Sequence, residues 1–248
     1  MANIILEAPV FTIEAALLAA ELGIDRLELC SDFQEGGETP SVGALAFLKE
    51  KLNIPIFVMI RPRGGDFVYS AEELYVMKKD IAILKSLGAD GFVFGVLRPD
   101  GQVDKEACRY LLKAAEDLPC TFHRAFDICK DKDRALKDII DCGFRRILTS
   151  GGENNVGLGM ENILDWMNQA EDKIMIMPGG GLSPEHLATL NRDGNLREIH
   201  ASCKTTRPSE TEYRHESVSL SKDPDSFFQV LSIDAKTVRA FKDKIQSL

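Results

Sequence analysis

The chain has 248 residues, of which 44% are hydrophobic and 28% charged, and its formal net charge is −9. This composition is typical of folded globular proteins and excludes disorder, collagen and coiled coil as its main character. No apolar run reaches the roughly 20 residues of a bilayer span, and the acidic balance argues against binding to nucleic acid or to anionic membranes. Because Glu7 interrupts the first apolar run and no basic leader precedes it, we expect a cytoplasmic protein. The six cysteines form no CxxC pair, so structural disulfides are not expected.

Short apolar runs recur along the chain and predict eight β-strands. They lie near residues 3–7, 25–30, 55–60, 91–96, 119–123, 146–150, 173–177 and 197–201. Stretches of helical period separate them, and three strands follow a repeated signature in which glycine ends a helix: LGIDRLEL, LGADGFVF and CGFRRILT. Eight such units in about 250 residues predict an α/β fold, a single (β/α)8 TIM barrel over residues 1–248. A doubly wound sheet is less favoured, because no GxGxxG follows the first strand.

The chain after the eighth strand is long and polar. We expect an extended loop at about 204–233 and then a final amphipathic helix opened by Asp234, with Val238, Phe241 and Ile245 on one face.

Alternation along the strands predicts an unusually polar barrel interior. If the apolar partners face the helices, the inward side chains are Glu7, Arg26, Glu28, Cys30, Met59, Arg61, Thr121, His123, Glu198, His200 and Ser202. Ordinary barrel interiors are filled with branched apolar side chains, and buried charges are costly unless they are paired or face a ligand. Most of these residues lie at the carboxyl ends of strands, where active sites of this fold are found. Mutually neutralised ion pairs are the alternative interpretation.

Arginines and glycines follow several strands and predict an anion site. IRPRGGDF (60–67) places Arg61 and Arg63 two residues apart, and two guanidinium groups can bind carboxylate or phosphate oxygens; pairing with Asp66 or Glu28 is the alternative. Glycine-rich turns, among them Gly180 and Gly181, can bind phosphate through backbone amides or can simply make tight turns.

The segment TFHRAFD (121–127) offers groups suited to proton transfer at the end of the fifth strand. His123 is a candidate acid or base, Arg124 adds a cation, and Asp127 could orient the histidine or cap the next helix. Together with the inward carboxylates, this gives a candidate catalytic set of Glu28, Arg61, His123, Asp127, Glu198 and His200.

Taken together, these motifs resemble the copper homeostasis protein CutC family. The matching strings are RLELC with EGGETPS, IRPRGGDF, FVFGVLRPDGQVD, TFHRAFD, RILTSGG, MPGGGL and EIHAS. They span nearly the whole barrel in order. The resemblance implies a TIM barrel and a cytoplasmic, often oligomeric protein associated with copper homeostasis, with a homodimer as the simplest assembly.

Copper is therefore the candidate metal, and no other cofactor is indicated. Intracellular copper is largely Cu(I), which prefers sulfur ligands, and Cys30 is the inward cysteine of the matched motifs. Some members of the family carry cysteine shortly after the first-strand glutamate and after the GGDF motif. This chain has Pro9 and Val68 at those positions. A site of Cys30 and Cys203, assisted by His123 or His200, remains open.

Three functions follow from these patterns. The first is a copper-handling protein, and the second is an enzyme in which Arg61 and Arg63 hold a small anion while His123 and Glu28 or Glu198 move protons. The third is an oligomeric scaffold whose polar interior is only structural.

Overall fold

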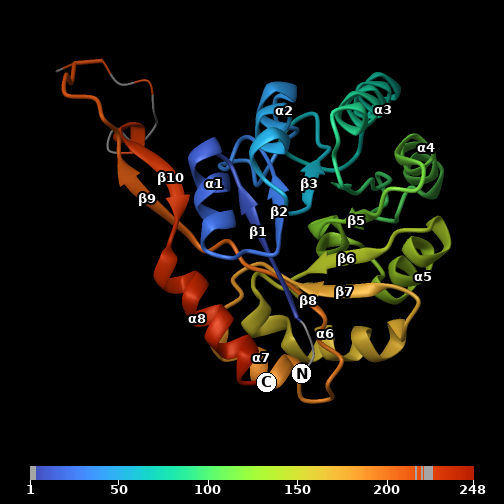
Figure 1. Ribbon diagram of the computed structural model, residues 1–248. Helices are drawn as coiled ribbons and strands as arrows, with labels where there is room; N and C mark the ends of the chain where they lie inside the picture. Colours follow the sequence, from blue (N-terminus) through green and yellow to red (C-terminus); the bar gives the residue numbers. More distant parts are fainter. Residues whose placement is uncertain (1–3, 216, 219, 221–225) are drawn as a thin grey trace.

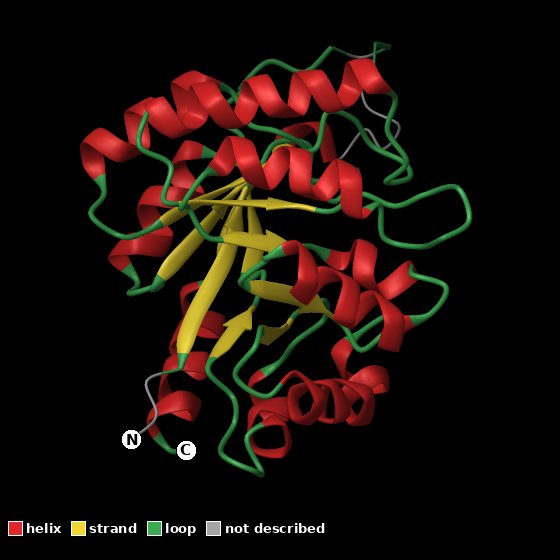
Figure 2. Ribbon diagram, turned by 90° about the vertical axis from the view of Figure 1, so that its right-hand side faces the viewer, coloured by secondary structure: helices red, strands yellow, loops and turns green. Residues whose placement is uncertain are grey.

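The computed structural model describes residues 4–215, 217–218, 220 and 226–248. Eight parallel strands form one curled sheet with helices outside it (Figures 1 and 2). They are β1 (Ile5–Val10), β2 (Arg26–Leu29), β3 (Ile56–Met59), β4 (Gly91–Phe94), β5 (Cys120–Phe122), β6 (Arg146–Thr149), β7 (Met175–Pro178) and β8 (Glu198–His200). The order is β7-β6-β5-β4-β3-β2-β1-β8, and a parallel bridge from Gly179 to His200 joins the two edges. The predicted TIM barrel is confirmed.

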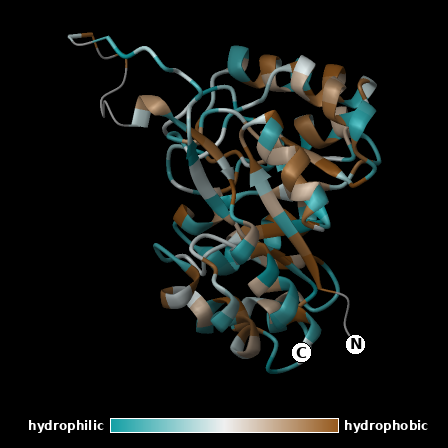
Figure 3. Ribbon diagram, turned by 60° about the vertical axis from the view of Figure 1, so that its left-hand side comes forward, coloured by the Kyte–Doolittle hydropathy of each residue, from teal (hydrophilic) through white to brown (hydrophobic). Residues whose placement is uncertain are grey.

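Helices connect successive strands and cover the outer face of the barrel. They are α1 (Ile13–Glu21), α2 (Val42–Lys51), α3 (Ala71–Ser86), α4 (Lys105–Ala115), α5 (Lys132–Cys142), α6 (Val156–Ala170), α7 (Leu187–Leu190) and α8 (Ala235–Gln246), with short 3-10 helices at η1 (Arg124–Ile128), η2 (Pro184–His186) and η3 (Ser226–Phe228). Teal and brown alternate along these helices in Figure 3, as expected of helices that turn one apolar face to a sheet. Within the described part of the chain, no helix is long and apolar enough to cross a membrane.

The repeated glycine signature has the predicted conformation. Gly23, Gly88 and Gly143 have φ angles of 83°, 89° and 101° at the ends of α1, α3 and α5. This left-handed conformation favours glycine because it has no Cβ. Each glycine lets the chain leave its helix and enter the next strand within a few residues.

The apolar and polar residues are sorted by strand alternation. A large apolar cluster fills the space between sheet and helices, and a small one inside the barrel contains Cys30, Phe57, Met59 and Val93. Leu148 and Met177 also lie inside, and the polar side chains of the interior are each less than one-tenth exposed: Glu7, Arg26, Glu28, Arg61, Thr121, His123, Arg146, Glu198 and His200. The polar interior expected from alternation is therefore present.

The segment expected as an extended loop at 204–233 begins and ends in strands instead. β9 (Lys204–Pro208) and β10 (Gln229–Ile233) pair antiparallel and project from the barrel (Figure 1). β9 is mostly exposed and polar, but its two threonines, together with Val230 and Ile233 of β10, are β-branched residues that suit a two-stranded ribbon. The Thr12 hydroxyl donates to the Leu231 carbonyl, 3.0 Å away, and fixes the ribbon to the start of α1. Asp234 caps α8, as predicted.

Candidate functional site

A cavity of about 320 Å³ opens at the carboxyl ends of the strands, and the base of the β9–β10 ribbon forms part of its wall. Its charged and polar lining includes Glu28, Arg61, His123, Arg124, His200, Ser202 and Lys204. Its apolar lining includes Pro9, Phe11, Met59, Phe67, Leu148 and Leu231. Mostly apolar walls with a few convergent polar groups are typical of small-molecule sites.

Below this cavity, four charged side chains form a buried ion network. Arg26 Nε lies 2.5 Å from Glu7 Oε2, and Arg26 Nη2 forms an ion pair with Glu198 Oε2. Arg146 reaches Glu198 with an Nε–Oε2 distance of 2.9 Å. The Phe57 ring lies against both guanidinium groups, whose Cζ atoms are each 4.8 Å from its centroid. Two carboxylates and two guanidinium groups thus neutralise one another.

The pKa values agree with a fully ionised network. Burial would raise the pKa of Glu7, but the charge of Arg26 and the hydrogen bond from His200 lower it to about 2. Burial would also raise the pKa of Glu198. The charges of Arg146 and Arg26 outweigh burial, so the pKa of Glu198 is lowered. The Glu198 carboxylate, a candidate base, is therefore held by two arginines beneath the cavity.

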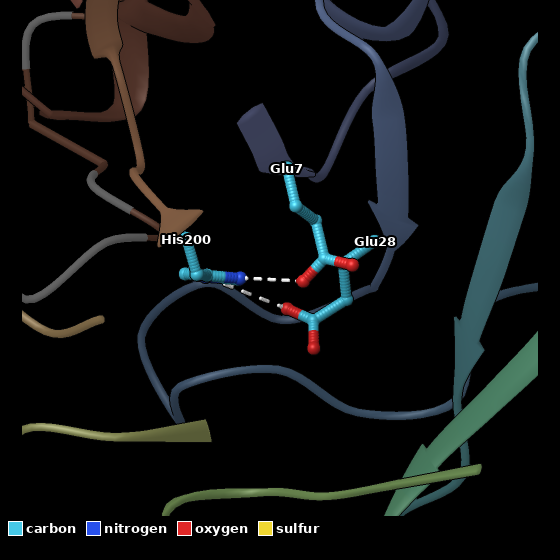
Figure 4. A group of neighbouring side chains, drawn as sticks. All are labelled: Glu7, Glu28 and His200. Carbon is cyan, nitrogen blue, oxygen red and sulfur yellow. Dashed lines mark hydrogen bonds and ion pairs between the residues drawn. The ribbon is translucent and has the colours of Figure 1, made fainter. Parts of the chain in front are cut away.

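Glu28 and His200 line the cavity, and His200 also contacts Glu7 of the ion network (Figure 4). His200 Nδ1 lies 2.8 Å from Glu7 Oε1, and His200 Nε2 lies 3.9 Å from Glu28 Oε2. The Cys30 thiol donates to Glu28 Oε2 over 3.7 Å. Burial raises the pKa of Glu28 to about 7, although the positive charge of His200 acts to lower it. Burial acts to lower the pKa of His200, but the negative charges of Glu28 and Glu7 outweigh it, so the pKa of His200 is raised.

His123 is a neutral imidazole that faces the cavity. Its Nδ1 accepts the Ala125 N–H at 3.2 Å, so Nε2 carries the proton of the neutral ring. The ring lies against Phe67, with centroids 4.6 Å apart, and a Cβ on Gly95 would come within 2.9 Å of Nδ1. Burial, and then the charge of Arg61, lower the pKa of His123 to about 3. The side chain therefore stays neutral at physiological pH.

Three residues of the cavity lining, Glu28, Arg61 and His123, each have one buried polar atom with no partner in the part of the chain that the structure describes. Among the described residues, neither Glu28 Oε1 nor His123 Nε2 makes a hydrogen bond. Both side chains are 4% exposed overall. Both side chains belong to the cavity lining, so an acceptor or protonated acid and an N–H donor border the cavity without a partner within the described ranges.

The three arginines proposed to bind an anion are differently placed. Arg61 lines the cavity, but its guanidinium donates to backbone carbonyls, those of Glu35, Gly37 and Gly65, and so shapes the loops. Arg63 is outside the cavity lining and pairs with Glu73 and Asp66. Arg124 lines the cavity and is oriented by Asp127, 2.8 Å away.

The loop after β6 binds a carboxylate of the chain itself. Asp127 accepts hydrogen bonds from the Thr149 hydroxyl and from the backbone N–H groups of Ser150 and Gly152. Asp127 therefore positions Arg124 and this loop, and does not contact His123 in the way expected of an orienting group in a His–Asp pair.

The glycines after β7 make room for neighbouring side chains. A Cβ on Gly180 would lie 3.0 Å from the Arg124 guanidinium, and one on Gly181 would lie 2.9 Å from Asn155. Both have left-handed φ angles, 99° and 69°. Neither glycine is part of the cavity lining.

The two candidate metal-binding cysteines lie on different sides of the sheet. Cys30 belongs to the inner cluster beside Met59, whereas Cys203 packs in the outer core. Burial raises the pKa of both thiols. Within the described chain, Glu7, Glu28 and His200 have ligand atoms within 4.8 Å of one another, but these oxygen and nitrogen donors fit Cu(I) poorly.

Several parts of the site were missed by the sequence interpretation. Arg146 begins β6 on the same face as Leu148, so alternation alone could have placed it inside. Phe57 between the two guanidinium groups and the ribbon residues of the cavity wall depend on tertiary contacts that no local pattern encodes.

Comparisons with known proteins agree on one family. A model of the CutC family matches residues 4–205. The human copper homeostasis protein cutC homolog is 45% identical over 216 residues, which cover 87% of this chain and 79% of the human protein. A CutC family protein of Bacteroides fragilis is 37% identical over 249 residues, covering 100% of this chain and 98% of its own. The structure of a Streptococcus agalactiae protein described as copper homeostasis protein CutC is 33% identical, with a TM-score of 0.74 over 82% of this chain and 99% of that one.

Proposed function

The chain belongs to the CutC family, and we propose that its cavity is the active site of an enzyme that performs general acid–base chemistry on a small anionic molecule. The observation that carries this proposal is the pair of unpartnered buried atoms, Glu28 Oε1 and His123 Nε2, at one cavity. An unsatisfied buried polar group costs about 1–3 kcal/mol, so a folded protein rarely leaves two together. A ligand that bonds to both atoms would recover that free energy.

Charge at the wall favours an anionic ligand. Arg124, Lys204 and one exposed carboxylate, Glu35, line the cavity, and both cations keep part of their side chains accessible to solvent. Arg61 adds a buried positive charge whose Nε has no partner among the described residues. These cations favour a carboxylate or phosphate group over a neutral one.

Of the titratable side chains at the cavity, some would take part in the reaction and others would hold the reacting groups in position. Glu28 has a pKa near neutrality, which suits a group that must both accept and release a proton. His123 supplies a hydrogen-bond donor. His200 faces Glu28 and is itself held by Glu7, so it orients the reacting carboxylate.

Anion binding tests this proposal. We expect inorganic phosphate, sulfate or acetate to raise the melting temperature of the protein, because a ligand that binds only the folded state stabilises it. Arg124→Ala should abolish the shift. Arg145→Ala, which removes an exposed arginine preceding β6, should keep it. If none of the three anions shifts the wild type, or if both variants lose the shift equally, the proposal is wrong.

Copper binding is a second candidate, suggested by the names of the relatives and by two sulfur-bearing side chains of the small cluster inside the barrel, Cys30 and Met59. A Cβ on Gly37 would lie 3.3 Å from Cys30 Sγ and 3.4 Å from Met59 Cε, so both side chains approach this glycine, and Met59 lines the cavity. Copper would be the bound cargo here. Copper analysis after incubation with Cu(I) and desalting tests this candidate: Cys30→Ser should lose copper that wild type and Cys142→Ser retain.

A further inference from the structure

We propose that the substrate is a small 2-oxo acid, and that the cavity removes a proton from the carbon next to its carbonyl group. This inference rests on the proposed function and names its substrate class. It follows from the kinds of polar atoms that face the cavity and from the charge of each.

His123 is suited to hold a carbonyl oxygen. The Ala125 N–H bond to Nδ1 fixes the tautomer, so the cavity is offered an N–H donor and no acceptor. The ring packs against Phe67, and the absence of a Cβ at Gly95 leaves room for it. A neutral imidazole stabilises negative charge developing on an oxygen without giving up its proton, which is the role of the polarising group in enolisation.

Glu28 is suited to take the proton. Its Oε1 has no partner in the described part of the chain, while Oε2 accepts a hydrogen bond from the Cys30 thiol and faces His200. The carboxylate therefore has one reactive oxygen and one positioned oxygen. Because Glu198 is bound by Arg26 and Arg146, it is not available for this role.

The reaction balances with these two groups alone. Glu28 Oε1 takes a proton from the carbon beside the carbonyl, and the C–H electron pair becomes the new C=C bond. The carbonyl π electrons move to the oxygen, where the His123 N–H stabilises the enolate. In the reverse step Glu28 returns a proton to carbon, so a Glu28 that has exchanged with D2O delivers deuterium.

The remaining walls fit the other parts of a 2-oxo acid. Arg124 and Lys204 bring positive charge to the cavity for the carboxylate. Phe67, Leu148 and Leu231 supply apolar wall that keeps water from the reacting carbon. A volume of about 320 Å³ is at the small end of ligand sites.

Proton exchange tests the inference directly. Pyruvate, 2-oxobutyrate and 2-oxoglutarate are incubated separately with the protein in D2O, and loss of the proton signal beside the carbonyl is followed by NMR. We expect exchange of at least one of them, reduced roughly 100-fold or more in Glu28→Gln and in His123→Ala. Glu212→Gln and His215→Gln, at exposed positions between β9 and β10, are the matched controls and should exchange at the wild-type rate. If none of the three acids exchanges faster than with Glu28→Gln, the inference is overturned.

A binding comparison separates this inference from the proposed function. Oxalate is planar and resembles the enolate of a 2-oxo acid, whereas glycolate has no carbonyl beside its carboxylate. Oxalate should bind wild type at least about tenfold more tightly than glycolate, because binding should favour the transition-state shape. His123→Ala should remove that preference while still binding acetate. If oxalate and glycolate bind equally while acetate raises the melting temperature, the site binds anions and the carbonyl inference is wrong.

Discussion

Two layers of the barrel interior are equally buried but differ in how their polar atoms are satisfied. In the lower layer, Glu7, Arg26, Glu198 and Arg146 neutralise one another. In the upper layer, Glu28 and His123 each leave an atom without a partner among the described residues. The difference indicates that burial of charge alone does not mark a functional site, and that an unpartnered buried atom in the lining of a cavity is the stronger signal.

The two layers are joined through His200, which contacts Glu7 below and Glu28 above. Because Glu7 stays ionised, it supports the charge of His200, and that charge in turn opposes the rise in the pKa of Glu28. The lower layer therefore has a second consequence besides stability, since it tunes the group that we propose to react.

The largest expected effect is on the stability of the lower layer. Arg26→Met keeps much of the side-chain volume but leaves Glu7 and Glu198 without their shared cation. We expect a loss of about 3–5 kcal/mol in the free energy of unfolding, the usual cost of breaking a buried ion pair from one side. Urea unfolding at pH 7 measures this loss, with Arg145→Met as the exposed control. A loss comparable to that of the control would show that the network contributes little.

In the upper layer, removing the charge of Glu28 is expected to raise the free energy of unfolding at alkaline pH. The pKa of Glu28 in the folded protein is about 7, above its ordinary value of 4.5, so the folded state binds the proton more tightly than the unfolded state between these values. Stability contributed by this group is therefore present at low pH and is lost as the pH rises through 7. Glu28→Gln removes the ionisation, and should be more stable than wild type at pH 8 by on the order of 2 kcal/mol, with little difference at pH 4.5.

Urea unfolding of wild type and Glu28→Gln at the two pH values measures this difference. Cys30, His200 and Glu7 face the same carboxylate, and because the charge of Glu28 raises the pKa of His200, the measured difference includes the linked change in His200. A variant less stable than wild type at pH 8 would mean that Glu28 is ionised at no cost, and would remove the distinction between the two layers.

Much of the interior was predictable because a strand has a simple period. Alternation placed Glu28, His123 and His200 inside, and the repeated glycine signature predicted where three of the strands begin. These are local properties of the chain. The barrel then brings the strand ends together, so residues as far apart as Glu7 and His200 meet without any local signal of their own.

The partners of long side chains could not be predicted in the same way. Arg61 and Arg63 come from one loop, and both were assigned to an anion site. A guanidinium on three methylenes can reach in several directions, and the surrounding loops decide which: Arg61 turns to three carbonyls, and Arg63 turns to Glu73. The ribbon at 204–233 was missed for a related reason, because its pairing depends on two segments separated by some twenty residues.

The smallest expected effect comes from Arg63 and tests this distinction between the arginines. Its side chain is paired with Glu73 and Asp66 outside the cavity lining, and exposed ion pairs contribute little. Arg63→Ala should therefore change the dissociation constant of acetate or phosphate by less than about twofold, because screening by water weakens its charge at the cavity. Titration calorimetry beside Arg124→Ala measures both. A loss of anion binding in Arg63→Ala as large as in Arg124→Ala would return Arg63 to the site and would show that the loop at 60–67 closes over the ligand.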